Sequence, residues 1–205
     1  MTPVNYIESP LLSRTPLAWA ESVLADPLAL LVDHAFLEKK AANNAMDMMT
    51  RWPGDWTPGW VETMTAVARD EAAHLAQVTR LLVKRGGRLG RVHKNPYAND
   101  LRRLVRKGEI GDTVDRLLVS AIIELRSAER FSVLAAAAND GELAALYGRL
   151  FASEWGHYQV FLRLARKVAP ADDVDARWRY MLEEEARILA AQPPGPRIHS
   201  GYSPV

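Results

Sequence analysis

The sequence predicts an all-α protein built around a bundle of four long helices, with shorter accessory helices. Three observations carry this prediction. Apolar residues recur in steps of three and four along four long stretches, the spacing that keeps side chains on one face of a helix. Pro, Gly, Asp and Thr stand where those stretches begin and end. No segment shows the sustained alternation, bounded by hairpin signals, that indicates a strand.

Helix starts are marked by side chains that can cap a helix, in three cases followed by proline at the first helical position. These starts are Thr15-Pro16, Asp26-Pro27, Thr57-Pro58 and Asp112. Helix ends are marked by glycine or proline, at Gly86-Gly87, at Asn139-Asp140-Gly141 and before Pro170. The expected elements are a short helix near 16–24, long helices near 27–50, 58–86, 112–139 and 141–168, and an amphipathic helix near 173–191. A proline-rich tail follows, at about 192–205.

The lengths of the connections predict the topology. The first two long helices are joined by the turn-rich segment WPGDWTPGW and the last two by a few residues, so we expect two antiparallel hairpins. A long basic connector, about 86–111, joins the hairpins and contains a short helical piece. Two hairpins joined by one long crossover make the ferritin-like form of the four-helix bundle.

Length and composition favour a single domain over residues 1–205, with 48% hydrophobic and 25% charged residues. No window approaches roughly eighteen uninterrupted apolar residues, and the N-terminus lacks the pattern of a secretory signal. We therefore expect a cytoplasmic protein without a membrane span. The chain has no cysteine, which excludes disulfides, thiolate catalysis and cysteine-ligated metal sites within it.

Each long helix carries one carboxylate in the middle of an otherwise apolar stripe. The four are Glu38, Glu71, Glu124 and Glu154, and His74 and His157 follow two of them three residues later. Polar groups on a core-facing stripe are costly unless something satisfies them. Two lone glutamates and two Glu-x-x-His pairs, one from each helix, are the ligand set of a carboxylate-bridged dinuclear metal site. Four carboxylates balance two divalent cations, and this mixed oxygen and nitrogen set suits iron or manganese.

The third long helix offers two candidate ligands. Glu124 lies on the apolar stripe, whereas Glu129 lies about one turn further on and could pair with Arg126 or Arg130. We favour Glu124 because of its place on the stripe. An alternative without metal pairs the buried carboxylates with arginines, which are abundant in this chain.

The other three histidines carry weaker signals. His34 lies one turn before Glu38 and could support the metal ligands or lie at the surface. His93 and His199 fall in predicted loops, where we expect them to be solvated.

The crossover is the most basic part of the chain. Residues 80–107 contain ten Lys or Arg residues and one acidic residue, Asp100, although the net charge of the whole chain is only +1. Such a block, with Tyr97 inside it, fits the phosphates and unpaired bases of RNA. The alternative is a solvated loop that pairs with acidic neighbours or another subunit. The RNA-binding candidates are Arg85, Arg88, Arg91, Lys94, Tyr97, Arg102, Arg103, Arg106 and Lys107.

Several segments resemble those of the bacterial tRNA hydroxylase family that acts on 2-methylthio-N6-isopentenyladenosine beside the anticodon. They are DHAFLEKKAA, RDEAAHL, KNPYANDLRRLVRKGE, IIELRSAERF, SEWGHYQVF and RIHSG, and the likeness runs from about Ala25 to Gly201. Ferritins, ribonucleotide reductase small subunits and quinone hydroxylases share the ligand pattern. The connector and the tail carry the specific match.

The resemblance implies a non-haem di-iron monooxygenase that hydroxylates the isopentenyl side chain of this tRNA nucleoside. The two iron ions it implies would be held by Glu38, Glu71, His74, Glu124, Glu154 and His157. Dioxygen would be the co-substrate, and a separate reductase would supply electrons, since the chain has no cysteine for an iron–sulfur centre and no dinucleotide fingerprint. The implied partners are the anticodon loop of tRNA and that reductase, without membrane or DNA.

Three other hypotheses stay open from the sequence. One is a ferritin-like ferroxidase or iron-storage protein, and another is a di-iron hydroxylase of a lipid or quinone-like substrate. The third is a helical adaptor without metal.

Overall fold

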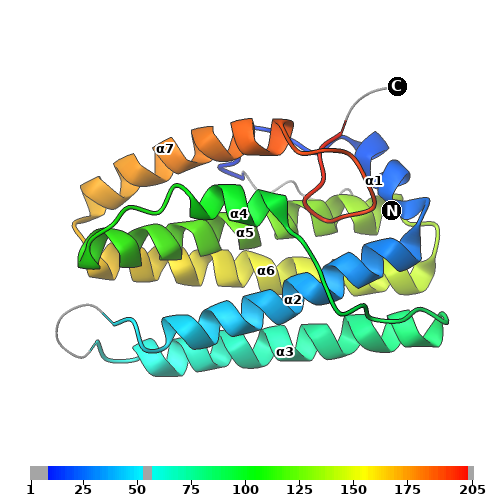
Figure 1. Cartoon of the computed structure of the whole chain (residues 1–205), viewed down its shortest axis with the longest axis horizontal. Helices are drawn as coiled ribbons and strands as arrows, with labels where there is room; N and C mark the ends of the chain where they lie inside the picture. Colours follow the sequence, from blue (N-terminus) through cyan, green and yellow to red (C-terminus); the bar gives the residue numbers. More distant parts are fainter. Residues whose placement is uncertain (1–8, 53–56, 203–205) are drawn as a thin grey trace.

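Two antiparallel helix pairs form the body of the molecule. The computed structural model describes residues 9–52 and 57–202, and this part holds seven α-helices and no strand. One pair is α2 (Pro27–Met48) with α3 (Trp60–Lys84), and the other is α5 (Glu109–Ala137) with α6 (Gly141–Val168). Figure 1 shows the connector running from the end of α3 across the bundle to the start of α5. The predicted all-α bundle with one long crossover is confirmed.

Three further helices cover this bundle. The short α1 (Leu17–Leu24) packs against α5, and α4 (Pro96–Arg102) is the helical piece within the crossover. The longer α7 (Ala171–Ala190) packs against α4, α5 and α6. The tail after α7 turns back toward α1 (Figure 1). In the part of the chain described, no helix combines the length and the apolar character that crossing a membrane requires.

Two helix starts follow the capping pattern of the sequence. Asp26 caps α2 by accepting a hydrogen bond from the Ala29 amide at 3.0 Å, with Pro27 at the first helical position. Asp140 caps α6 in the same way, by accepting from the amides of Glu142 and Leu143. These local signals fix the starts of α2 and α6, two of the helices that carry the predicted ligands.

At three other predicted starts, the residue expected to cap the helix does not cap it, although each helix begins within three residues of the expected position. The residue before α1 is Pro16, and Thr15 instead donates its amide and hydroxyl hydrogens to Glu129, both at 2.6 Å. Helix α3 starts after Gly59 (φ 77°) and α5 after Gly108 (φ 105°), backbone conformations that favour glycine. Glycine geometry thus overrides the caps predicted at Thr57 and Asp112. Residues 53–56 of the predicted turn-rich loop lie outside the described part.

The core consists of two apolar clusters on either side of a polar layer. One cluster contains Trp60, Met64, Leu117 and Phe161, and the other contains Leu30, Val78, Leu134 and Tyr147. Along each long helix, the predicted carboxylate falls between residues of the first cluster and residues of the second. Burial of apolar surface on both sides therefore fixes the position of the polar layer along the helices and directs its side chains toward the core.

Candidate metal centre

The six predicted ligands meet in the polar layer between the two apolar clusters. They are Glu38 in α2, Glu71 and His74 in α3, Glu124 in α5, and Glu154 and His157 in α6. All six are buried, with exposed fractions of 6% or less. The spacing of three residues places a carboxylate and an imidazole on the same side of α3 and of α6.

Their ligand atoms form two adjoining groups. Within each group, one oxygen or nitrogen from every residue lies within 4.8 Å of the others. The groups are Glu38, Glu71, His74 and Glu154, and Glu71, Glu124, Glu154 and His157. Glu71 and Glu154 belong to both groups, so they would be shared if each group held one cation.

Both histidines direct Nδ1 at the shared carboxylates. His74 Nδ1 lies 3.0 Å from Glu154 Oε1, and His157 Nδ1 lies 2.6 Å from Glu71 Oε1. Yet neither nitrogen, nor any carboxylate oxygen of Glu71 and Glu154, has a hydrogen bond of acceptable geometry. Buried polar atoms are almost always satisfied. A set of buried oxygens and nitrogens that converge on one another without well-formed hydrogen bonds therefore fits a pair of metal ions.

Proximity and burial shift the protonation of this cluster strongly. Burial, with the charges of Glu154 and Glu38, raises the pKa of Glu71 to about 8. Burial lowers the pKa of His74, but close contacts with Glu154, Glu38 and Glu71 outweigh burial and raise it to about 12. Burial likewise lowers the pKa of His157, and contacts with Glu154 and Glu71 raise it to about 10. At neutral pH, protons are therefore bound to side chains that would ligate a cation, so cation binding must release these protons.

His34 supports Glu38 from within the core. Its Nε2 lies 2.5 Å from Glu38 Oε1, and its ring stacks on Tyr147 with centroids 5.5 Å apart. Complete burial lowers the pKa of His34 to about 4, so the ring is neutral. A neutral ring with its proton on Nε2 donates it to the carboxylate and fixes the carboxylate orientation, as residues behind metal ligands do.

The two carboxylates of α5 have different surroundings. Glu124 belongs to the ligand cluster. Glu129 accepts a hydrogen bond from Arg126 at 3.0 Å and two from Thr15, outside the cluster. Glu124 is therefore the carboxylate that the structure brings to the other five residues.

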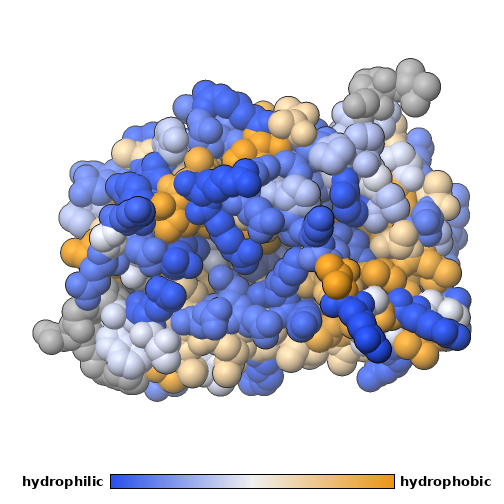
Figure 2. Space-filling view, in the orientation of Figure 1, coloured by the Kyte–Doolittle hydropathy of each residue, from blue (hydrophilic) through white to orange (hydrophobic). Residues whose placement is uncertain are grey.

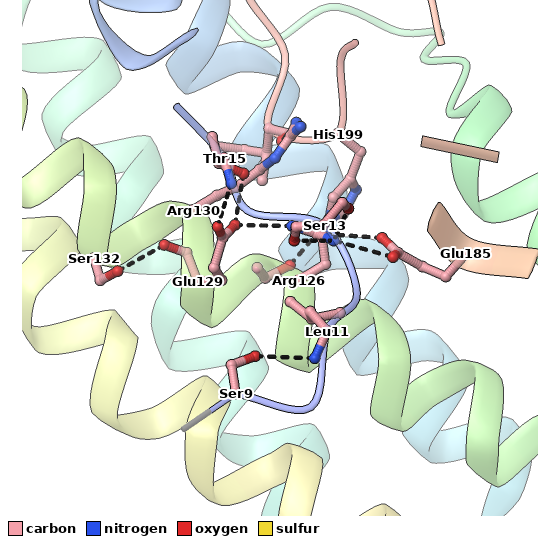
Figure 3. Close-up of polar contacts among 12 residues, drawn as sticks. Ser9, Leu11, Ser13, Thr15, Arg126, Glu129, Arg130, Ser132, Glu185 and His199 are labelled. Atoms are coloured by element: carbon pink, nitrogen blue, oxygen red, sulfur yellow. Dashed lines mark hydrogen bonds and ion pairs between the residues drawn. The ribbon is translucent and has the colours of Figure 1, made fainter. Parts of the chain in front are cut away.

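A buried ion-pair network ties α5 to its neighbours (Figure 3). Arg126 is fully buried and donates to the two oxygens of Glu185 in α7 at 2.8 and 3.0 Å. Its other contacts are Glu129 and the Ser13 carbonyl and hydroxyl oxygens. One side chain thus links α5 to α7 and to the segment before α1. The sequence did not indicate Glu185, because its partner lies 59 residues away in the chain.

The two loop histidines are not solvated as expected. His199 is 5% exposed, shares a hydrogen bond at 3.1 Å with Ser127 Oγ, and stacks on Tyr97. His93 Nε2 lies 2.7 Å from Asp33 Oδ1. The expectation was wrong because the tail folds back onto α5 and the connector folds onto α2, contacts that no local pattern encodes.

A narrow cavity leads to the carboxylates. Its lining includes four ligands and an apolar wall, namely Glu38, Glu71, Glu124, Glu154, Leu37, Ala41, Val119, Ile123 and Phe131. Three polar residues also line it: Lys40 and Asn44 are half-buried, and Arg102 is exposed. The volume is about 50 Å³, whereas one water needs about 10–15 Å³. The cavity therefore has room for a slender aliphatic group but not for a nucleobase.

The basic candidates of the crossover divide into paired and unpaired cations. Arg85 pairs with Asp140 at 2.7 Å, Arg106 with Asp115 at 2.9 Å, and Arg103 with Asp100. The cations without a carboxylate partner in the described ranges are Arg88, Arg91, Lys94, Arg102 and Lys107, and all five are exposed. Figure 2 shows that the face between α4 and α2 is mainly hydrophilic.

Tyr97 does not lie at this surface. It is fully buried and donates its hydroxyl hydrogen to Glu185 at 2.9 Å. Its ring is therefore not available to stack on an RNA base, contrary to the expectation from its place among the cations. Burial and Glu185 raise its pKa well above the ordinary value, so the hydroxyl stays protonated and remains a donor.

The fold and the site together define a class of protein. A four-helix bundle with one crossover and inward-facing Glu and Glu-x-x-His residues is a ferritin-like helical protein of the dinuclear carboxylate type. A solved structure of this fold is similar over 95% of this chain and 98% of its own, with a TM-score of 0.87 and 35% identity. It is Protein 43 with aldehyde deformylating oxygenase activity from Synechococcus.

The particular family follows from the sequence match. The chain belongs to the family described as tRNA-(MS[2]IO[6]A)-hydroxylase (MiaE), whose profile matches residues 2–200. The tRNA 2-(methylsulfanyl)-N(6)-isopentenyladenosine(37) hydroxylase of Pseudomonas putida is 38% identical over 91% of this chain and 90% of its own length. The enzyme of the same name from Salmonella typhimurium is 32% identical over 82% of this chain and 61% of its own length. The resemblance stated from the sequence is confirmed.

Proposed function

We propose that this protein is a di-iron hydroxylase of tRNA that acts on the isopentenyl side chain of 2-(methylsulfanyl)-N6-isopentenyladenosine. The observation that carries the proposal is the cluster of six buried ligand side chains, four of which line a small cavity with an apolar wall. The names of the two bacterial relatives support the choice of substrate. An iron-storage role or a quinone-like substrate gains no support from the basic residues at the mouth of this cavity.

The ligand cluster would hold the two iron ions. Glu71 and Glu154, which belong to both groups of ligand atoms, would help to hold both ions, and His74 and His157, whose Nδ1 atoms face these carboxylates, would each help to hold one. When bound, the iron pair supplies the activation of dioxygen and the oxidation of a C–H bond. Electrons would come from a separate reductase, because this chain has no cysteine for an iron–sulfur centre.

The surrounding residues position the substrate and exclude water. The apolar wall formed by Leu37, Ala41 and Ile123 would accept the isopentenyl group and keep bulk water from the carboxylates. Because a base does not fit the cavity, the adenine ring would stay at the mouth. A nucleoside beside the anticodon is unpaired, so its side chain can enter without the breaking of a base pair. His34 would keep Glu38 in its ligating orientation through the Nε2 proton.

The test is hydroxylation of isopentenylated tRNA by the iron-loaded, reduced protein in the presence of dioxygen. Mass spectrometry of the digested nucleosides should show the gain of one oxygen atom, and Glu154→Ala should abolish the gain. Glu142→Ala removes an exposed carboxylate from the same helix, and this control variant should still add the oxygen atom. No gain with the unaltered protein, or full activity of Glu154→Ala, would contradict the proposal.

A further inference from the structure

The rim of the cavity carries two positive charges that no carboxylate neutralises. Lys40 from α2 and Arg102 from the last turn of α4 both line it. Lys40 Nζ lies 2.9 Å from His93 Nδ1 and 3.4 Å from the His93 carbonyl oxygen, and it forms no ion pair among the described residues. Arg102 is exposed and has neither an ion pair nor a side-chain hydrogen bond in that part of the chain.

The carboxylate whose charge acts on Lys40 is already engaged elsewhere. Asp33 accepts hydrogen bonds from His93 Nε2 at 2.7 Å and from the Ile198 amide at 2.8 Å, so both of its oxygens are occupied within the fold. Lys40 and Arg102 belong to different elements, α2 and the crossover. Two like charges brought to one rim by separate elements repel each other, and an anion between them relieves that repulsion.

A neighbouring amide adds a further donor to the rim. Asn95 also lines the cavity, and its Oδ1 caps α4 by accepting from the Ala98 amide at 3.2 Å. Its side-chain nitrogen therefore remains as a donor. The rim thus offers a lysine, an arginine and an amide, all of which donate hydrogen bonds to phosphate oxygens.

We propose that Lys40 and Arg102 bind a backbone phosphate of RNA, at or next to the nucleotide whose side chain enters the cavity. This inference rests on the function proposed above and adds the anchoring point of the substrate. The base remains at the mouth because the cavity is too small for it, so its adjoining phosphates stay near the rim. The arrangement separates two tasks: the apolar wall accepts the side chain, and the cation pair fixes the register of the RNA backbone.

The paired arginines of the crossover contribute less to RNA binding. Arg103 and Arg106 are engaged with Asp100 and Asp115, so contact with RNA must first break an internal ion pair. Among the five unpaired cations, Arg102 is the one that lines the cavity, and the structure adds Lys40, which lies outside the basic crossover. Sequence patterns do not indicate Lys40, because the fold alone brings it to the same rim as Arg102.

The test compares two double variants that remove equal charge. Lys40→Gln/Arg102→Gln removes the cation pair, and Arg163→Gln/Lys167→Gln removes two exposed cations of α6 that do not line the cavity. The probe is an anticodon stem–loop RNA that contains the isopentenylated nucleoside, and its Kd is measured by fluorescence anisotropy over a series of salt concentrations. Bound iron per chain is measured for every variant.

The cation-pair variant should bind the RNA roughly tenfold more weakly or worse, since hydrogen bonds to charged groups are stronger than neutral ones. The slope of log K against log salt should become shallower by about 0.7 for each phosphate of a single strand that the variant no longer neutralises. Iron content should not change, and the α6 variant should keep its affinity within about twofold. Arg102→Lys, which keeps the charge, should retain most of the affinity.

The outcomes separate this inference from the proposed function. If the unaltered protein neither binds nor hydroxylates the RNA, the proposed function fails. If it does both, and the cation-pair variant keeps its Kd and salt slope, the phosphate site is wrong while the function stands. Should the double variant lose iron, the single variant Arg102→Gln decides, because this exposed side chain has no ion pair and no side-chain hydrogen bond in the described part of the chain. An unchanged salt slope in that variant also overturns the inference.

Discussion

The fully buried pair of Arg126 and Glu185 gives a quantitative test of how the fold supports the site. Replacing Arg126 by methionine keeps an unbranched side chain in the core but removes its hydrogen bonds to Glu185, Glu129 and Ser13 (Figure 3). Glu185 then stays buried with only Tyr97 as a donor. Removing one partner of a buried ion pair costs about 3–5 kcal/mol, so the free energy of unfolding should fall by that amount.

Urea denaturation and thermal unfolding measure this loss. For a chain of this length, a change of about 1 kcal/mol shifts Tm by about 2–4 °C, so the Tm of Arg126→Met should fall by roughly 6–20 °C. The control is Arg166→Met, which removes an arginine bound to Asp175 at 2.8 Å in a pair that is nearly half exposed. That change should cost about 1 kcal/mol or less, because water already solvates both charges.

A double-mutant cycle tests whether the unpaired charge of Glu185 causes this loss of stability. Glu185→Gln keeps an acceptor for Tyr97 and removes the charge that Arg126 neutralises. The double variant should lose about 1–3 kcal/mol less than the sum of the single losses, because it leaves no unpaired charge between the two positions. Additive losses, or a loss in Arg126→Met no larger than in Arg166→Met, would refute this reasoning.

Three further predictions concern the site. In the folded protein, the pKa values of His74 (about 12) and His157 (about 10) lie above the ordinary value of 6.5. Protonation of these two side chains therefore stabilises the metal-free fold fully below pH 6.5, and this stabilisation is lost as the pH rises through 10–12. Metal binding at pH 7 should accordingly release at least two protons per chain, seen by calorimetry in buffers of different ionisation enthalpy; binding without release would contradict the assignment. Glu124→Gln should lower bound iron, whereas Glu129→Gln should preserve it and only reduce stability, and the reverse result would exchange the two residues. Ala41→Leu narrows the cavity, so it should lower the rate of hydroxylation about tenfold or more while the iron content stays unchanged. An unchanged rate would show that the isopentenyl side chain of the substrate does not enter this cavity.

The parts of the site that the sequence predicts are those set by helical periodicity. Glu71 and His74 lie three residues apart on one helix, so their common direction follows from local geometry. The same holds for Glu154 and His157. Four apolar stripes, each interrupted once by a carboxylate, suffice to predict the bundle and its ligand layer.

The parts that the sequence does not predict depend on contacts between distant segments. The Ile198 amide donates to Asp33 across 165 residues, and this contact brings the tail and His199 to the wall of the cavity. Tyr97 is buried because Glu185, 88 residues further along, accepts its hydroxyl hydrogen. Glycine also determines where α5 begins, since Gly108 adopts a φ of 105° that a capping aspartate would not.

Iron stoichiometry tests the central claim most directly. The metal-free protein is loaded anaerobically with ferrous iron, freed of excess, and its bound iron is counted by elemental analysis against protein concentration. Two iron ions per chain are expected, because the ligand atoms form two adjoining groups, and Glu71→Ala/Glu154→Ala should bind none, because it removes the two residues that both groups share. Absence of bound iron in the unaltered protein, or two ions retained by this double variant, would contradict the account.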